Sequence, residues 1–269
     1  MIDRQALERL YEGYNRRKFV HPDPLEFLYN YRDLRDREVV GLIASSLAYG
    51  RVAQILRSVS GVLDKLGPSP CEFLLNSSQD SLLSLFAQFK HRFTTGSELV
   101  EMLLGAARVV RRYGSLHQCF AAGLKEEHET VLPAACAFVE KLAPWQGENR
   151  SSLIPSPSRG SACKRLNLFL RWMVRADEVD PGGWDQVPAS KLVVPVDTHI
   201  HRIGLFLGFT NNKCANINCA LELTNAFKRF APDDPVRYDF ALTRLGMRGQ
   251  KDLDSFFAEI SALGSHADT

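Results

Sequence analysis

Three features of the sequence predict an all-α protein. Apolar residues recur at three- and four-residue spacing in eight segments, as they do along one face of an α-helix. Glycine, proline, asparagine or aspartate bounds these segments. No stretch alternates apolar and polar residues over a length that would form a sheet. We therefore expect eight or more helices, packed in one or two lobes.

The expected helices follow one another along most of the chain. They are predicted at Glu38–Gly50, Val52–Leu66, Glu98–Tyr113, Thr130–Leu142, Ala162–Arg175, Thr198–Leu207, Ala215–Phe230 and Pro235–Leu245. Two segments rich in proline, glycine and polar residues, 143–160 and 176–190, are expected to be loops. They flank the helix at 162–175 on both sides, and long loops beside one helix are common places for a functional site.

The composition is that of a globular protein with a sizeable core. The chain has 269 residues, of which 45% are hydrophobic, so it can form one large domain or two small lobes. Its 33 lysines and arginines nearly balance 31 aspartates and glutamates, which leaves a formal net charge of +2. A nucleic-acid partner would therefore have to be held by a local basic surface and not by bulk charge.

Membrane insertion and metal binding are not indicated by the sequence. No apolar run reaches the roughly 18 to 20 residues of a membrane span, and residues 1–16 lack the layout of a signal peptide, so we expect a cytoplasmic protein. The six cysteines are scattered and contain no C-x-x-C pair, which argues against zinc and iron–sulfur sites. We expect no metal and no cofactor.

The expected helix at 162–175 has one apolar face and one basic face. At about 100° per residue, Lys164, Arg171 and Arg175 lie within about 40° of one another, opposite the apolar sector. A solvated surface is the simplest interpretation of such a stripe. Lys164 differs because it lies in the first turn, where the helix dipole and neighbouring Arg165 disfavour its ammonium form. If it is also partly desolvated, this lysine could act as a nucleophile on a carbon centre.

Asp197 stands where a short extended run meets a helix, in the stretch VVPVDTHIHRIGLFLGF. Its simplest role is that of an N-cap, with its carboxylate accepting a hydrogen bond from the backbone N–H of His199 or Ile200. An ionised carboxylate at a helix N-terminus would also suit a group that faces a developing positive charge. His199 and His201 point about 200° apart on a helix, so we do not expect them to share a metal.

The stretch VPVDTHIHRIGLFLGF resembles the aspartate-bearing segment of the helix-hairpin-helix (HhH-GPD) DNA glycosylases of the endonuclease III superfamily. EVVGLIASSLAYGRVAQI is similar to an early helix of that fold, and DPVRYDFALTRLG to a late one. Lys164 stands at the place of the superfamily's catalytic lysine. Its separation from the aspartate, 197 − 164 = 33, is closer to the archaeal 8-oxoguanine glycosylase branch than to endonuclease III itself. Through GSACKRLNLFLRWMVR and VVPVDTHIHRIG, the whole chain is identified as a member of the DUF2400 family.

The resemblance implies a two-lobed, helical DNA glycosylase-like fold that spans residues 1–269 as one unit, with a cleft between the lobes. It implies a base-excision repair enzyme with lyase activity, which acts as a monomer on double-stranded DNA carrying a damaged or modified base and is associated with the nucleoid. The base would be flipped into the cleft, and Lys164 would attack C1′ of its sugar. Ionised Asp197 would stabilise the oxocarbenium-like state.

The region that corresponds to the superfamily's hairpin is altered. The usual L-P-G-V-G-x-K is replaced by IPSPSRGSACK, so a DNA phosphate would have to be bound by Gly160, Ser161 and the amides of 161–163. The glutamine that many members insert into the duplex is replaced by YGR. Tyr49 and Arg51 are therefore candidates to stack or wedge, with an interhelical tyrosine and a surface arginine as the alternative. The four-cysteine cluster loop is missing.

Further DNA contacts are expected from residues close to the two catalytic candidates in the sequence, namely Arg165, Arg171, Arg175, His199 and Arg202. Trp172 and Trp184 are candidates to stack on a flipped base, with packing as the alternative for Trp172. Two other classes stay open. One is a nucleic-acid-binding module that keeps the fold without chemistry, and the other is a helical interaction protein that shows no salt-dependent binding of nucleic acid.

Overall fold

Helices make up nearly all of the regular structure in the computed structural model, which describes residues 4–142 and 153–248. The all-α prediction is confirmed, and the sheet found among these residues is a single two-stranded antiparallel hairpin. Of the expected loop at 143–160, residues 143–152 lie outside the described part of the chain. None of the described helices has the length and apolar character that crossing a membrane requires.

The elements carry the following bounds. The α-helices are α1 (Arg4–Tyr14), α2 (Leu34–Ser46), α3 (Val52–Leu66), α4 (Pro70–Asn76), α5 (Gln79–Leu85), α6 (Gly96–Tyr113), α7 (Leu116–Ala121), α8 (Leu132–Leu142), α9 (Lys164–Val174), α10 (Thr198–Phe206), α11 (Ile217–Lys228) and α12 (Asp239–Arg248). The 3-10 helices are η1 (Arg17–Phe19), η2 (Pro24–Asn30), η3 (Pro157–Arg159) and η4 (Ala189–Lys191), and the strands are β1 (Lys90–His91) and β2 (Thr94–Thr95).

Each of the eight expected helices is present, and α3 has the predicted bounds. α2 begins earlier than expected because Asp33 caps it, accepting hydrogen bonds from the backbone N–H groups of Arg35 and Asp36. α1, α4, α5 and α7 were not expected. The last three have only six or seven residues, which is too short to show a helical period.

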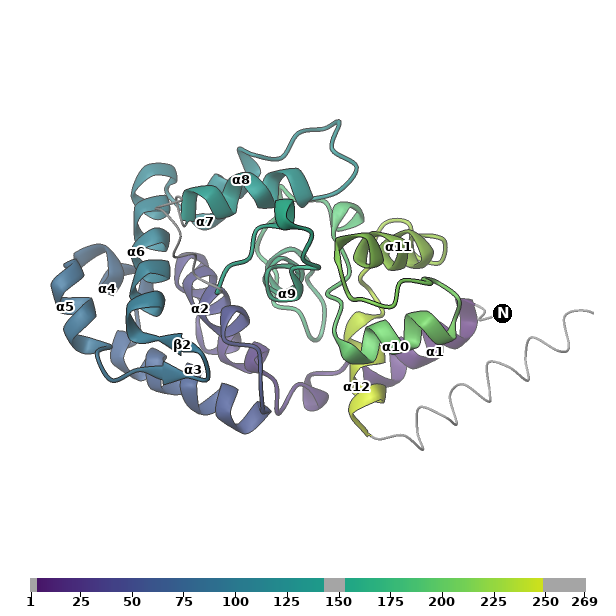
Figure 1. The fold of residues 1–269 in the computed structure, drawn as a ribbon, viewed down its shortest axis with the longest axis horizontal. Coiled ribbons are helices and arrows are strands. Elements are labelled where there is room, and N and C mark those ends of the chain that lie inside the picture. The colour runs from purple at the N-terminus through teal and green to yellow at the C-terminus, as the bar shows by residue number, and fades with distance from the viewer. Residues whose placement is uncertain (1–3, 143–152, 249–269) are drawn as a thin grey trace, which may run out of the picture.

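The helices gather in two groups on either side of α9 (Figure 1). α2 to α8 lie on one side, and α1, α10, α11 and α12 lie on the other. α2 packs directly against α9, and Gly41 permits the close approach, because a Cβ at that position would lie 3.3 Å from the side chains of Phe169 and Met173. Arg165, at the start of α9, accordingly reaches the end of α2 and donates a hydrogen bond to the carbonyl oxygen of Ser46 at 2.8 Å.

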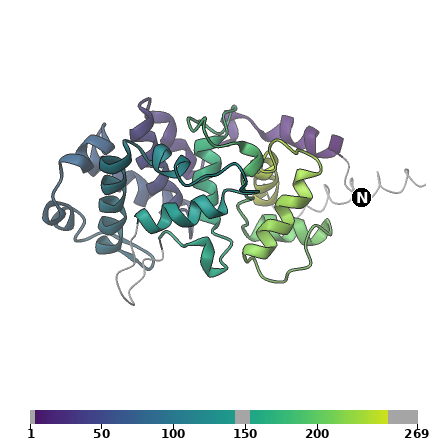
Figure 2. The ribbon, with the colours of Figure 1, turned by 90° about the horizontal axis from the view of Figure 1, so that it is seen from above.

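The first and last described helices are neighbours in space (Figures 1 and 2). The carboxylate of Glu8 on α1 accepts hydrogen bonds from the Arg237 guanidinium at 2.9 Å and the Tyr238 hydroxyl at 2.7 Å. These two residues immediately precede α12. This contact holds α12 against α1. Because α12 also packs against α10, the contact helps to position one wall of the candidate site.

Candidate active site

A cavity of about 620 Å³ opens where α9, α10, α12 and the turn between α2 and α3 meet. Residues from distant parts of the sequence line it, among them Tyr49, Lys164, Asp197 and Asp239. The volume lies within the range of sites that hold small molecules or single groups of a larger ligand. Both residues expected to be catalytic therefore face one cavity.

Lys164 is the first residue of α9, which confirms its predicted place in the first helical turn. Cys163 precedes it with a φ of 47°, in the left-handed region, and this conformation turns the chain into the helix. The turn is held by hydrogen bonds from the Cys163 N–H to Ser161 Oγ at 3.2 Å and from the Asn167 amide to the Ala162 carbonyl at 2.9 Å. The Lys164 side chain is 37% exposed, so it is partly desolvated.

Asp197 is the N-cap of α10, as predicted. Its Oδ1 accepts a hydrogen bond from the backbone N–H of Ile200 at 2.8 Å. The extended segment before it is buried, and Val194 donates its N–H to Thr224 Oγ1 at 3.0 Å. The junction of a buried extended segment with a capped helix thus fixes the position of the carboxylate, whose side chain is 14% exposed.

The two oxygens of the Asp197 carboxylate have different partners. Oδ1 caps α10, whereas Oδ2 lies 3.8 Å from Lys164 Nζ. That separation is an ion pair without a direct hydrogen bond, and such contacts commonly shorten when a substrate binds. An amine and a carboxylate in one cavity are the groups that an amine nucleophile requires, because the carboxylate can accept its proton or face a cationic centre.

A second carboxylate lines the cavity. Burial raises the pKa of Asp239 to about 6. The negative charge of Asp197 adds to this increase, whereas the ion pair with Arg171 opposes it. His199 lines the same cavity and packs against Gly246 of α12, where a Cβ would lie 2.8 Å from His199 Nδ1. Within the described ranges, no three histidine, cysteine, aspartate or glutamate side chains are grouped so that they could hold a metal ion.

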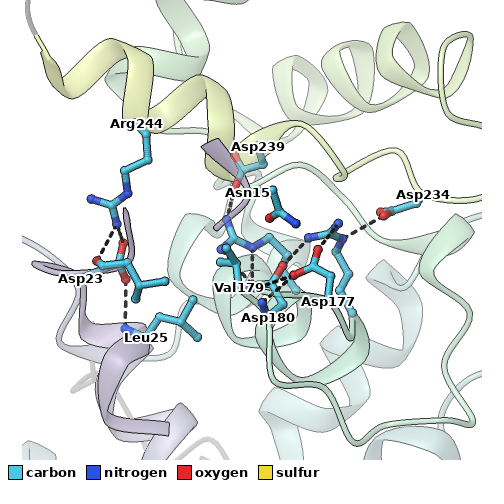
Figure 3. A network of polar contacts seen from close by, with 12 residues as sticks. Asn15, Asp23, Leu25, Asp177, Val179, Asp180, Asp234, Asp239 and Arg244 are labelled. Carbon is cyan, nitrogen blue, oxygen red and sulfur yellow. Dashed lines mark hydrogen bonds and ion pairs between the residues drawn. The ribbon is translucent and has the colours of Figure 1, made fainter. Parts of the chain in front are cut away.

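The solvated basic stripe expected on α9 is wrong for two of its three members. Arg171 and Arg175 are buried, with side chains only 4% exposed. Asp180 pairs with both of them, Asp239 pairs with Arg171 and Asp234 pairs with Arg175 (Figure 3). Buried guanidinium groups require such partners. These carboxylates lie outside α9, so a helical projection of α9 alone could not show that its arginines are buried and paired. The structure therefore does not present either side chain at the surface for the expected DNA contacts, although Arg171 contributes to the cavity lining.

Tyr49 and Arg165 form part of the cavity wall and pack on each other. The Arg165 guanidinium carbon lies 4.9 Å from the centroid of the Tyr49 ring. The Tyr49 hydroxyl donates to the carbonyl oxygen of His91 on β1 at 2.8 Å. The side chain is thus held at both its ring and its hydroxyl, as the packing alternative expects, and because it also lines the cavity its role as a wedge stays a prediction.

The two tryptophans are core residues. Trp184 is 1% exposed, donates its indole N–H to Glu38 Oε1 at 2.9 Å and stacks on His117, so the prediction that it could stack on a flipped base is wrong. Trp172 is equally buried, which confirms the packing alternative, although it also contributes to the cavity lining.

The remaining expected contact residues lie on the surface near the cavity or on its adjoining elements. Gly160 and Ser161 are exposed in the turn before α9, where Gly160 has a φ of 77° and Ser161 lines the cavity. The Gly160 carbonyl accepts a hydrogen bond from Ile217 at 2.9 Å, which holds this turn against the start of α11. Arg51 is exposed immediately before α3, and Arg202 is exposed on α10.

The hairpin of β1 and β2 was not expected from the sequence. Strands of two residues are too short to show alternation, so no sequence signal marks it. Asp239 was also missed as a cavity residue. Its place at the start of the apolar run FALTRLG is a signal that could have indicated a helix-terminal carboxylate.

The part of the chain that carries this site is matched by the model of one protein family. A family model described as a protein of unknown function (DUF2400) matches residues 23–248, which is most of the chain and includes Lys164, Asp197 and Asp239. No curated protein and no solved structure matches the sequence. The chain therefore belongs to the DUF2400 family.

Proposed function

We propose that this protein is a DNA glycosylase with lyase activity, which removes a damaged or modified base from double-stranded DNA. The observation that carries the proposal is the pair of Lys164 and Asp197 in one cavity, with 3.8 Å between Nζ and Oδ2. The two groups of helices on either side of α9 would then be the lobes of a helix-hairpin-helix glycosylase fold with an altered hairpin. A role on chromosomal DNA would place the protein, as a monomer, at the nucleoid.

In the proposed reaction, the Lys164 ammonium first gives a proton to solvent, and its free amine then attacks C1′ of the flipped nucleotide while the bond from C1′ to the base nitrogen breaks. The electron pair of that bond leaves with the base, which takes up a proton. Positive charge develops on the sugar ring, and the Asp197 carboxylate stabilises it. The carboxylate then accepts the proton that the lysine nitrogen loses. Opening of the sugar ring gives a Schiff base between Lys164 and C1′, from which β-elimination breaks the strand.

The surroundings of the pair support this reaction. The cavity is of a size to take one base, and the side chains of Asp197 and Asp239 are largely removed from water, so charges inside it interact more strongly than at the surface. Arg51 and Arg202 are exposed on elements that adjoin it. Because the net charge of the chain is only +2, local basic residues such as these would have to hold the phosphates.

Trapping of the Schiff base tests the proposal. Duplex oligonucleotides that carry different damaged bases would be incubated with the protein, and borohydride would be added during turnover. We expect a covalent protein–DNA adduct with at least one lesion, strand cleavage in the absence of borohydride, and loss of both in Lys164→Gln. The matched control is Lys191→Gln, because Lys191 lies on η4 and is not part of the cavity lining.

The outcomes separate the proposed enzyme from a binding module. Adduct formation that survives in Lys164→Gln would place the nucleophile on another residue. Salt-dependent binding of DNA without base release on any lesion would indicate a glycosylase-like module without chemistry. Absence of binding and of turnover would reject both.

A further inference from the structure

We propose that Asp239 donates a proton to the departing base, so that the two carboxylates of the cavity have different tasks. This inference rests on the proposed function and assigns the source of the proton that the base takes up when its bond to C1′ breaks. Asp239 is the first residue of α12 and lines the cavity together with Lys164 and Asp197.

The two oxygens of the Asp239 carboxyl group have different surroundings. Oδ2 accepts a hydrogen bond from the Arg171 guanidinium. Oδ1 is buried and has no hydrogen-bond partner among the described residues. Buried polar atoms without a partner are uncommon in folded proteins, and a catalytic role is one reason for them. A proton on Oδ1 would make this oxygen a donor and would leave the hydrogen bond from Arg171 to Oδ2 in place.

The charges around Asp239 favour its protonated form. In the described part of the chain, the guanidinium groups of Arg171 and Arg175 form ion pairs with four carboxylates, those of Asp177, Asp180, Asp234 and Asp239 (Figure 3). Two positive charges cannot neutralise four negative ones, and the Asp197 carboxylate adds a further negative charge near Asp239. Such an excess of negative charge favours a carboxyl group that holds a proton.

Other ionisable groups on α12 and on the elements packed against it do not supply the missing positive charge. His199 contacts α12 near its other end, at Gly246. The charged groups already have partners of opposite charge, namely Arg244 with Asp23, Lys164 with Asp197 and Arg237 with Glu8. Asp239 therefore depends on Arg171, which it shares with Asp180.

Asp180 does not compete with Asp239 for the proton, although burial raises the pKa of Asp180 as well. Its Oδ1 accepts hydrogen bonds from Arg171 Nε at 3.1 Å and Nη2 at 3.0 Å, and its Oδ2 accepts one from Arg175. A proton on either oxygen would displace a guanidinium donor. Asp239 has one oxygen without such a donor, and burial raises its pKa to about 6. A pKa near the working pH is what a general acid requires.

The proton transfer completes the bond cleavage of the proposed reaction. When the bond from C1′ to the base nitrogen breaks, its electron pair goes to the base. The O–H bond of Asp239 breaks at the same time, and its proton forms a new N–H or O–H bond on the base. Asp239 is left as a carboxylate beside Arg171, whose positive charge stabilises it, and solvent returns a proton before the next turnover. Two carboxyl groups whose surroundings hold them in different protonation states are a known basis for acid and base roles in one site.

A duplex with a preformed abasic site separates proton donation to the base from the chemistry of Lys164. Such a site, made by removing uracil from a duplex, has no base left to protonate, so its cleavage requires Lys164 but not Asp239. We expect Asp239→Asn to cleave this duplex at the wild-type rate and to form the same borohydride adduct. On the damaged base that the trapping screen identifies, its single-turnover base release at pH 6 should be slower by about 100- to 10,000-fold, because a general acid contributes a factor of that order.

The pH dependence is a readout that a purely structural role would not change. The wild-type protein uses the protonated carboxyl group, whose population falls about tenfold for each pH unit above a pKa of about 6. Titration of Lys164 affects both proteins and cancels in the ratio of their rates. The ratio of wild-type to Asp239→Asn base release should therefore fall about tenfold per unit above about pH 7. A ratio that stays constant with pH would overturn the inference.

The control variant is Asp234→Asn, because Asp234 pairs with Arg175 in the same network but does not line the cavity. It should release the base at the wild-type rate. Wild-type base release by Asp239→Asn rejects the inference and leaves the proposed function standing. Loss of both activities in Asp239→Asn would assign this residue to the fold or to Lys164, and the inference would again be rejected.

The wild-type protein itself distinguishes the two proposals. If it cleaves the abasic duplex but releases no base from any lesion, no leaving base exists for Asp239 to protonate, and only the lyase half of the proposed function remains. If it neither cleaves the abasic duplex nor releases a base, the proposed function fails, and the inference fails with it.

Discussion

Replacement of Asp197 by asparagine separates helix capping from catalysis. In the structure, Oδ1 caps α10 through Ile200 and Oδ2 faces Lys164. Asparagine keeps an oxygen for the cap, and asparagine and aspartate rank together at N-cap positions. The substitution removes only the negative charge and places an amide where Oδ2 stood. Any large effect must therefore come from the lost charge.

The expected loss of stability is small. The interaction of the carboxylate with the dipole of α10 contributes about 0.3–1 kcal/mol. The pair with Lys164 spans 3.8 Å and its lysine is 37% exposed, so it contributes at most about 1 kcal/mol. The free energy of unfolding of Asp197→Asn should thus fall by about 0.3–2 kcal/mol. Asp197→Ala should lose a further ~1 kcal/mol, because it also loses the cap.

The expected loss of activity is large. If the carboxylate faces an oxocarbenium-like sugar, removal of this preorganised charge should slow base release about 100- to 1000-fold. The assay is single-turnover base release at saturating protein, on whichever lesion the trapping screen identifies. Urea denaturation gives the stability of each variant, and anisotropy gives its DNA affinity, so a slow variant can be distinguished from an unfolded or unbound one.

A matched control is available at another helix. Asp33 caps α2 with the same kind of hydrogen bond, is exposed and does not line the cavity, so Asp33→Asn should lose a dipole interaction of about 0.3–1 kcal/mol and leave the rate of base release unchanged. Base release by Asp197→Asn within about tenfold of the wild-type rate would refute the catalytic role, since preorganised charges contribute more than that. Asp197 would then be a helix cap, and the proposed mechanism would fail.

Two further predictions concern the polar core. Arg171→Met should lower the free energy of unfolding by about 3–5 kcal/mol in urea denaturation, because it leaves Asp239 buried without a partner and Asp180 with Arg175 alone. Met in place of exposed Arg57 should cost less than about 0.5 kcal/mol. A small loss for Arg171→Met would contradict the buried network. Burial raises the pKa of Glu38 to about 7. Since the folded pKa lies above the unfolded value of about 4.3, the protonated carboxyl favours the folded state, and its contribution is lost as the pH rises through about 7. Stability should therefore fall between about pH 4 and pH 7, and the fall should be smaller in Glu38→Gln; equal pH profiles would contradict this assignment.

Local features of the candidate site could be predicted because they depend on neighbours in the sequence. Asp197 precedes an apolar helix and satisfies backbone donors that any helix N-terminus leaves unpaired, so its cap was predicted, with Ile200 as one of the two expected partners. Lys164 lies at the start of α9 for a similarly local reason, since an apolar period begins there after a turn rich in serine and proline. The all-α class follows from the same period repeated along the chain.

The sequence by itself determined the helical class, the approximate positions of eight helices and the local settings of Lys164 and Asp197. Only the tertiary structure decided which charges are buried. Arg171 and Arg175 read as a solvated stripe from α9 alone, but loop and α12 carboxylates surround them. Tertiary packing likewise brought Lys164 within 3.8 Å of Asp197. The physical reason is that a periodic pattern reports the faces of one element, whereas burial and ion pairing depend on elements that are distant in sequence and meet only in the fold.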